Sequence, residues 1–184
     1  MIVVDGGSED ATRELATGLC DRVVAAPPGR AVQMNAGARQ ARGDVLVFLH
    51  ADTRLPSNAD ELVQGPLWGR FDVQIEGRNP LLKVVAWSMN LRSRLTGVAT
   101  GDQAIFVRRA AFPGFPELPL MEDVAFSKAM RRHSRPACLR DKVTTSGRRW
   151  ESRGVVRTVL LMWRIRFLYA IGTDPASLAR LYER

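Results

Sequence analysis

Two short apolar runs, each followed at once by an acidic turn, constrain this chain more than any other feature. Residues 1–4 lead into an Asp-Gly-Gly-Ser turn and a helical pattern, and residues 45–49 lead into His-Ala-Asp at positions 50–52. Such runs, rich in β-branched side chains and bounded by turn residues, are typical of strands, and the second is continuous enough to be buried on both faces. Strands that alternate with helices predict right-handed βαβ units, and so an α/β fold with a mainly parallel sheet.

The rest of the chain continues this alternation within one domain. At 184 residues with 46% hydrophobic content, it is long enough for one compact core and too short for two comfortable ones. Hydrophobic periodicity predicts strands at 22–26, 68–76, 101–108 and 137–145, helices at 31–41, 58–64, 79–95, 122–132 and 155–171, and a proline-rich loop at 112–120.

Composition restricts the cellular compartment and the kinds of partner that we expect for the protein. Cys20 and Cys138 are far apart and have no metal-ligand spacing around them, so a reducing cytoplasm is expected. No signal peptide is recognisable, and no segment approaches the roughly 18 apolar residues of a spanning helix. The net charge of +8 favours an anionic partner, namely nucleic acid, a membrane surface or a phosphorylated small molecule, and charge alone does not choose among them.

Two acidic residues stand where ligands bind in α/β proteins. Ligands bind at the carboxyl ends of parallel strands, and Asp5 and Asp52 both follow a predicted strand. Asp5 also fits an ordinary turn, with Ser8 or Asp10 capping the next helix. A carboxylate such as Asp52 is an oxygen ligand that a divalent cation bound to phosphate would need, while a cap or turn role stays open.

Several segments, in order, resemble family 2 glycosyltransferases, and in particular a small bacterial subgroup of them. The similarity covers essentially the whole chain, and its strength lies in the order and spacing of the motifs rather than in any one of them. The matching segments are MIVVDGGSEDAT at 1–12, GRAVQMNAGARQARG at 29–43 near the diphosphate, FLHADT at 48–53 as a variant of the metal-binding DxD, GDQ at 101–103, the ED motif at 122–123, and GRRW at 147–150 as a variant of QxxRW.

The resemblance implies a GT-A fold: a mainly parallel, Rossmann-like sheet flanked by helices. Residues 1–56 would be the nucleotide-binding half, 57–154 the acceptor-side half and 155–184 a C-terminal helical segment. The family's first βα unit and its Asn-Glu loop have no counterpart before residue 1. We interpret the sequence as a truncated form of a longer protein, with a degenerate homologue as the alternative. The missing strand predicts an exposed sheet edge or apolar face, and homodimerisation as an option.

The resemblance also implies roles for particular residues. Asp123 would be the base that deprotonates an acceptor hydroxyl in an inverting transfer, and Asp52 would hold Mg²⁺ or Mn²⁺ against the diphosphate. His50 replaces the first acidic residue of DxD, so it is a less suitable metal ligand and we expect it to orient Asp52 or a phosphate. The donor nucleotide would contact Asp5, Gly7, Ser8, Arg30 and Asn35, and the acceptor or phosphate side would comprise Gly101, Asp102, Gln103, Glu122, Arg149 and Trp150.

Structural explanations remain open for several of these residues. Glu122 and Asp123 stand at a predicted helix start, where carboxylates also stabilise the helix dipole. Arg148 and Arg149 fit either a phosphate clamp or an exposed surface. Trp68 and Trp150 are expected in the core or in a pocket wall, because large aromatic side chains are highly buried on average.

The predicted partners are a UDP- or GDP-sugar donor and a hydroxyl acceptor of unknown identity, with no nucleic acid. The pattern at 155–171 predicts either a core helix or an interfacial membrane helix. A lipid-linked acceptor, with the protein peripheral at the inner face of the membrane, would favour the second interpretation.

The rival functions are less well supported. A nucleotidyltransferase also uses an α/β sheet and a metal-binding Asp, but it would need a longer glycine-rich loop with a basic residue after the first strand. No G-x-G-x-x-G of a dinucleotide-dependent dehydrogenase follows that strand. A nucleic-acid-binding module would explain the charge, yet no aromatic-basic recognition motif accompanies it. An inactive nucleotide-binding homologue remains a further alternative.

Overall fold

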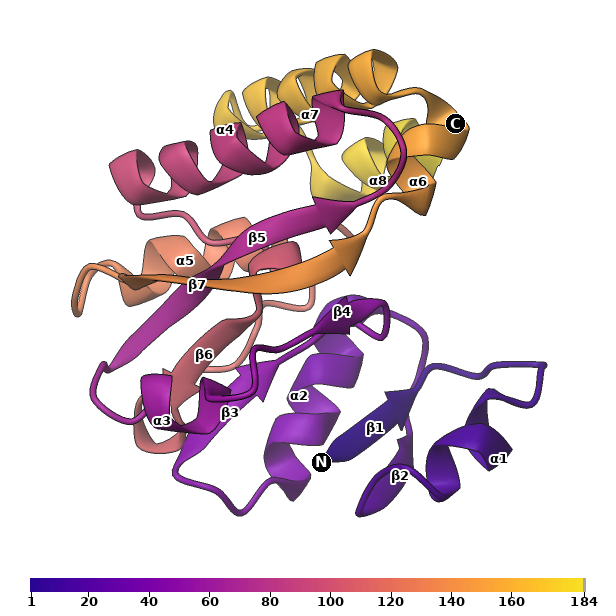
Figure 1. Ribbon diagram of the computed structural model, residues 1–184, viewed down its shortest axis with the longest axis vertical. Coiled ribbons are helices and arrows are strands. Elements are labelled where there is room, and N and C mark those ends of the chain that lie inside the picture. The colour runs from indigo at the N-terminus through magenta and orange to yellow at the C-terminus, as the bar shows by residue number, and fades with distance from the viewer. Residues whose placement is uncertain (184) are drawn as a thin grey trace.

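The computed structural model describes residues 1–183 and has an α/β architecture with two sheets and flanking helices (Figure 1). A small parallel sheet joins β1 (Ile2–Asp5) to β2 (Arg22–Ala25) through α1 (Thr12–Thr17). The main sheet has the order β3-β6-β5-β7-β4. Its strands are β3 (Val45–Phe48), β4 (Thr53–Arg54), β5 (Trp68–Glu76), β6 (Ile105–Arg108) and β7 (Ala137–Ser146).

The α/β class is confirmed, but the main sheet is mixed rather than mainly parallel. In that sheet only β5 and β7 pair in parallel, whereas β3 with β6, β6 with β5, and β4 with β7 are antiparallel. Hydrophobic periodicity predicts where a strand lies in the sequence but not which strand it pairs with. Strand β3 pairs with the distant β6 and not with β1. Strand β3 is also only half-buried apart from Leu46, so the expected burial on both of its faces is wrong.

The helices begin and end within a few residues of the predicted limits. The five predicted ones are α2 (Arg30–Gln40), α3 (Ala59–Leu62), α4 (Leu81–Thr96), α5 (Glu122–Met130) and α7 (Val155–Ala170). Two further helices are α6 (Arg148–Arg153) and α8 (Pro175–Glu183). Helix α4 ends at Gly97, which adopts a left-handed φ of 66° that glycine tolerates without strain.

Four elements differ from the prediction. Residues 101–103 form a 3₁₀ turn (Gly101–Gln103) instead of the start of a strand, because Thr100 and Gln103 complete a capping box around it. Strand β4 and helices α6 and α8 were not predicted. The first two are too short for a periodic signal, and α8 follows a turn in which the Asp174 carboxylate accepts the backbone N–H of Ser177 at 3.1 Å.

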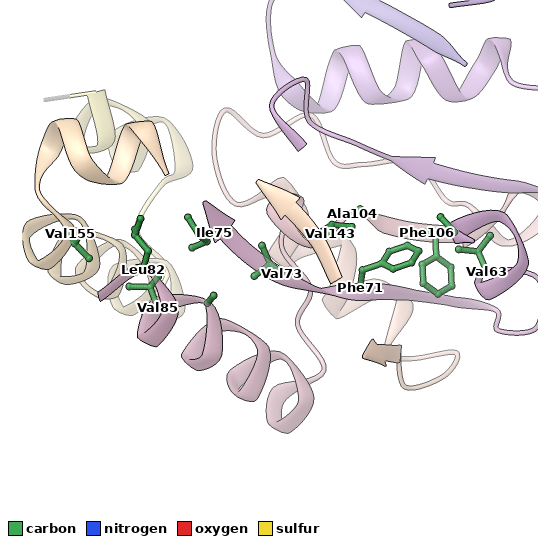
Figure 2. Packing of buried hydrophobic residues seen from close by; sticks show 12 residues of the cluster. Val63, Phe71, Val73, Ile75, Leu82, Val85, Ala104, Phe106, Val143 and Val155 are labelled. Carbon is green, nitrogen blue, oxygen red and sulfur yellow. The ribbon is translucent and has the colours of Figure 1, made fainter. Parts of the chain in front are cut away.

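Three apolar clusters hold the layers together. The first packs β5, β6 and β7 against α3 and α4 and includes Phe71, Phe106 and Val143 (Figure 2). The second joins α2, β3, β6 and α5 around the fully buried Trp68, as expected for that residue. The third packs α5 against α7 and α8. The C-terminal helices are thus part of the fold that surrounds the strand ends.

The small β1–α1–β2 unit is more exposed than the rest. Strand β1 pairs on one side only among the described strands. Leu15 of α1 and Leu19, just after it, are 70% and 76% exposed, and α1 has no buried residue. An open edge and an uncovered apolar face are what the sequence predicts for this part of the chain.

A buried ion network fixes α4 to β5. The Arg70 side chain is fully buried, and its guanidinium donates to the Ser93 hydroxyl at 3.0 Å and to the Asn90 carbonyl at 3.1 Å. It also pairs with Asp72, whose second oxygen accepts Arg94 at 2.6 Å. Because all these partners lie on β5 and α4, the network sets the position of α4 against the sheet.

We expect Asp72→Asn to lower the free energy of unfolding by about 3 kcal/mol, because it leaves the buried Arg70 without its counter-charge. Urea unfolding followed by circular dichroism measures the change. Glu76→Gln is the matched control, since Glu76 lies on the same strand and pairs with Arg54 at 2.7 Å with both side chains more than half exposed. That substitution should cost less than about 1 kcal/mol. Equal effects of the two substitutions would contradict the role of the network.

Candidate functional site

A cavity of about 390 Å³ lies among α4, α7, the 3₁₀ turn at 101–103 and the start of α5. Both charge signs line it, together with apolar side chains from α4 and α7. Nine of the predicted site residues line this one cavity, brought from five segments of the chain. They are Arg30, His50, Asp52, Gly101, Asp102, Glu122, Asp123, Arg149 and Trp150.

Asp123 is held rigidly at the start of α5. One carboxylate oxygen accepts the Gly101 N–H at 3.1 Å and the other accepts the Val124 N–H at 2.7 Å. The residue that precedes the acidic pair, Met121, has a left-handed φ of 70°. A buried non-glycine residue in this conformation is uncommon and strained, and it persists only where the surrounding structure fixes it. The backbone therefore aims Asp123 at the cavity.

His50 and Asp102 form a second pair in the cavity wall. The His50 Nδ1 atom lies 3.4 Å from the Asp102 Oδ1 atom. Burial acts against the ionised form of Asp102, but the hydrogen bond and charge of His50, with Arg30 and Arg149, outweigh it and hold the pKa of Asp102 below its usual value. The imidazole packs so closely on Gly101 that a Cβ there would lie 2.5 Å from Nε2. Glycine at 101 is required for this arrangement.

Glu122 is a buried carboxylate whose nearest cation is Arg30, with Nη1 and Oε1 4.0 Å apart. Burial and the neighbouring charge of Asp123 raise the pKa of Glu122 above its usual value, and Arg30 opposes this only in part. Burial disfavours the Arg30 cation as well, but Glu122, Tyr182, Asp102 and Asp123 together raise the pKa of Arg30. Glu122 thus faces into the fold and holds Arg30 beside the cavity.

Asp52 is exposed at the cavity and has little else to bind. Its Oδ1 atom accepts the Thr53 hydroxyl at 3.4 Å, and Thr53 is in turn bonded to Thr145 at 3.0 Å. Within residues 1–183 no group of three or more His, Cys, Asp or Glu side chains is arranged to hold a metal ion. Mg²⁺ at phosphate sites uses one or two carboxylates and completes its shell with phosphate oxygens and water. Asp52, with His50 nearby, fits that kind of site.

Five predicted site residues do not line the cavity. Asp5 accepts the backbone N–H groups of Gly7 and Ser8, at 3.2 and 3.1 Å, and the Ser8 hydroxyl. It shapes the turn after β1. The Asn35 amide bonds the backbone of Phe115 in both directions at 2.8 Å, and Gln103 is fully buried and bonded to Thr100 and Asn90.

The sequence reasoning missed several cavity residues, among them two arginines and a tyrosine. Arg92 comes from α4, Arg166 from α7 and Tyr182 from α8. The Arg149 guanidinium lies over the Tyr182 ring, 4.3 Å from its centroid. A signal existed for the arginines, because Arg92 falls on the helical face of Val85 and Met89, and a cation that interrupts an apolar face is unusual. No sequence signal places the end of α8 at the site.

The mixed α/β sheet with its flanking helices is a GT-A fold, as its similarity to solved structures shows. Residues 1–72 match the model of glycosyl transferase family 2, which confirms the resemblance over that part of the chain. No curated protein matches the sequence.

Two solved structures support the fold along more of the chain. One is titled a mycobacterial protein, with a TM-score of 0.53 and 18% identity over 79% of this chain. The other is glucosyl-3-phosphoglycerate synthase from Mycobacterium tuberculosis in complex with phosphoglyceric acid, with a TM-score of 0.53 and 18% identity over 78% of this chain. The chain spans 54% and 58% of the lengths of these two proteins. At this identity the likeness establishes the fold.

Glu122→Gln should change the pH dependence of stability. Because the native pKa of Glu122 is raised, the folded state binds this proton more tightly than the unfolded state, so the wild type loses stability as pH rises through that native pKa. A glutamine does not titrate. We therefore expect the melting temperature of Glu122→Gln, relative to wild type, to increase from pH 4 to pH 7 in calorimetric scans. Glu117→Gln, at an exposed glutamate outside the cavity, is the control, and a flat or falling difference for Glu122→Gln would refute the assignment.

Proposed function

We propose that this protein is a glycosyltransferase that moves a hexosyl group from a UDP- or GDP-sugar to a hydroxyl acceptor. One observation carries the proposal. Asp123 is fixed by two backbone N–H groups in the same cavity as Asp52 and the arginines Arg30 and Arg149. A general base, an oxygen ligand for a divalent ion and cations for a diphosphate are the groups that transfer from a nucleotide sugar requires.

Each of these residues would supply one part of the transfer reaction. Asp123 takes the proton of the acceptor hydroxyl as it attacks the anomeric carbon, opposite the departing diphosphate, so that the configuration inverts. Asp52, with His50 beside it, would hold Mg²⁺ or Mn²⁺, which when bound neutralises charge on the leaving nucleoside diphosphate. Arg30 and Arg149 are placed to bind phosphate oxygens. Glu122 positions Arg30, and Asp102 orients His50.

The nucleoside would lie toward the turn after β1. Asp5, Gly7 and Ser8 form that turn, with the Asp5 carboxylate ordering it and Gly7 at a φ of 97°. Asn35 then acts by fixing the Phe115 loop beside α2. The open β1 edge and the exposed Leu15 and Leu19 are where a second copy of the chain would pair, if the protein is a homodimer.

Asp52→Ala and Asp123→Ala should both abolish transfer but differ in donor binding. Removal of the base should lower the rate by about 10²- to 10⁴-fold and leave nucleotide affinity unchanged, whereas Asp52→Ala should weaken metal-dependent affinity at least tenfold. Calorimetry with UDP and GDP in the presence of Mn²⁺ measures binding, and assays of nucleoside diphosphate release from a panel of UDP- and GDP-sugars measure transfer. Equal donor affinity in the two variants would contradict the roles. Release of pyrophosphate instead would indicate a nucleotidyltransferase.

We further propose that the protein binds membranes through one apolar surface formed by α4 and α7. The two helices lie side by side at one end of the molecule (Figure 1). Their outward faces carry eight large apolar side chains that are each 40–69% exposed. This α4–α7 apolar surface comprises Val84, Trp87, Leu91, Leu95, Val156, Leu160, Trp163 and Phe167.

Charge supports an anionic bilayer as the occupant of this surface. Arg157 and Arg164 each follow one of its apolar residues directly, so the helix places them about 100° around, at the border of the apolar stripe. On α4, the exposed Lys83 directly precedes Val84, the first of the exposed apolar residues of that helix in this surface. Exposed tryptophans with flanking cations are typical of interfacial helices. Two copies paired through this face would bring these like charges together. Trp163 also lines the cavity, so an acceptor anchored in lipid would meet the site at the rim of this surface.

Among residues 1–183, no helix is both long enough and apolar enough to cross a bilayer. Binding would therefore be interfacial.

The double variant Trp87→Ser/Trp163→Ser should bind vesicles at least tenfold more weakly than wild type, because each exposed indole contributes about 1.5–3 kcal/mol when buried. Sedimentation with vesicles of phosphatidylcholine and phosphatidylglycerol measures this, and binding should weaken with salt. Leu15→Ser/Leu19→Ser, which removes two similarly exposed apolar side chains from α1 and the turn after it, is the matched control. Unchanged vesicle binding, or conversion of a dimer to a monomer instead, would contradict membrane docking.

A further inference from the structure

Arg92 is the one polar side chain in residues 1–183 whose buried nitrogen atoms lack any partner. Both Nη1 and Nη2 are shielded from solvent, line the cavity and have no hydrogen bond. Arg70, on β5 beneath the same helix, is fully buried and has three partners, whereas Arg92 is partly buried and its two terminal nitrogens have none. A guanidinium has five N–H donors, and leaving them unpaired in the interior is costly. The contrast indicates that a ligand supplies the missing acceptors for Arg92.

A second cation converges on the same place. Arg166 reaches the cavity from α7, opposite Arg92 on α4, and none of the described ion pairs includes either residue. Burial and the charge of Arg166 lower the pKa of Arg92 to about 10, with Asp123 acting in the opposite direction. Burial lowers the pKa of Arg166 as well, against Asp123 and Asp102. Two like charges held together without a counter-ion form a site for an anion.

We propose that Arg92 and Arg166 bind an oxyanion, a phosphate or carboxylate, that is part of the acceptor. The proposal rests on the transfer reaction proposed above. Both arginines exert their charge on Asp123, the group that faces the acceptor hydroxyl. The diphosphate of the donor has other cations, Arg30 and Arg149, which come from α2 and α6 and act on Asp102. The anion of the acceptor would thus be bound beside the base, and it would position the hydroxyl for attack.

The surroundings of the two arginines restrict the acceptor further. Val85, Met89, Val159 and Met162 form apolar walls next to them. The expected acceptor therefore has a hydroxyl, an oxyanion and an apolar portion or a lipid tail. Soluble phosphate esters and phospholipid head groups share the oxyanion chemistry, and the experiment separates these two sources.

The test uses melting temperatures of the full chain as wild type, Arg92→Met and Arg166→Met. Arg132→Met is the matched control, because it removes the same charge from the exposed turn after α5, outside the cavity and outside the α4–α7 apolar surface. The probes are inorganic phosphate, glycerol phosphate, and vesicles of phosphatidylcholine with phosphatidic acid. A probe that binds should raise the melting temperature of wild type and of Arg132→Met by about 2–5 °C at ten times its Kd. Both cavity variants should lose the response to the soluble probes. Their response to vesicles should fall below that of Arg132→Met, because docking on the α4–α7 apolar surface is common to all four proteins.

Two further readouts separate this proposal from the transfer reaction. UDP or GDP with Mn²⁺ should stabilise all four proteins equally, because the donor does not use Arg92 or Arg166. Without ligand, Arg92→Met should melt about 2–8 °C above wild type, since it removes a buried charge that has no partner. A gain in stability combined with a loss of anion response is the signature of a binding residue, and a structural arginine would show the reverse.

A response to the soluble probes points to a soluble acceptor, and a response to the vesicles alone points to a lipid; both support the anion site. No response of wild type to any probe, or equal responses in Arg92→Met and Arg132→Met, would overturn it. Loss of the nucleotide response in Arg92→Met would also overturn it, because Arg92 would then hold the donor. Failure of all four proteins to bind either nucleotide would instead count against the transferase reaction and leave the anion result standing.

Discussion

The buried pairing of Arg70 with Asp72 is the interaction on which the arrangement of the site depends. It places a charge in the core and satisfies it with groups from β5 and α4 only. Because a buried cation is costly without its partners, α4 has little freedom to rotate or slide on the sheet. One face of α4 is thereby fixed on β5, and the face that carries Ser88 and Arg92 is fixed on the cavity.

The fixed position of α4 also fixes the place of Arg92 among the charged groups of the cavity. Carboxylates and guanidinium groups alternate around it: Asp102 balances Arg30, His50 and Arg149, and Glu122 lies within 4.0 Å of Arg30. Arg92 and Arg166 break this balance. They act on Asp123 through their charge and form none of the described ion pairs with it, so positive charge remains beside the carboxylate that we propose as the base. Helices α4 and α7 carry Arg92 and Arg166 toward the cavity and exposed apolar side chains on their outward faces. The surroundings of each helix therefore change from charged to apolar within one helix turn.

Much of the fold could be read from the sequence, because long periodic segments carry their own signal. The limits of β5 and α5 were predicted within two residues, and the Asp123 region was predicted from its ED motif. What failed depends on contacts between distant residues. No pattern in residues 45–49 reveals that β3 pairs with β6, and the capping box that curls residues 101–103 is a local polar interaction inside an apparent strand. The position of Tyr182 at the cavity depends on how α8 packs, which no local pattern encodes.

The match to glycosyl transferase family 2 ends at residue 72, whereas the cavity is lined by residues from both sides of that point. Residues 1–72 supply Arg30, His50 and Asp52, the groups suited to a diphosphate and its metal. Asp123, Arg92 and Arg166 all come from beyond residue 72, on helices packed around the other side of the cavity. A donor common to many enzymes requires a recurrent pattern, whereas the acceptor differs from one enzyme to the next. If the chain is the transferase proposed above, the acceptor would be recognised by the part of the chain beyond residue 72, which contains Asp123, Arg92 and Arg166.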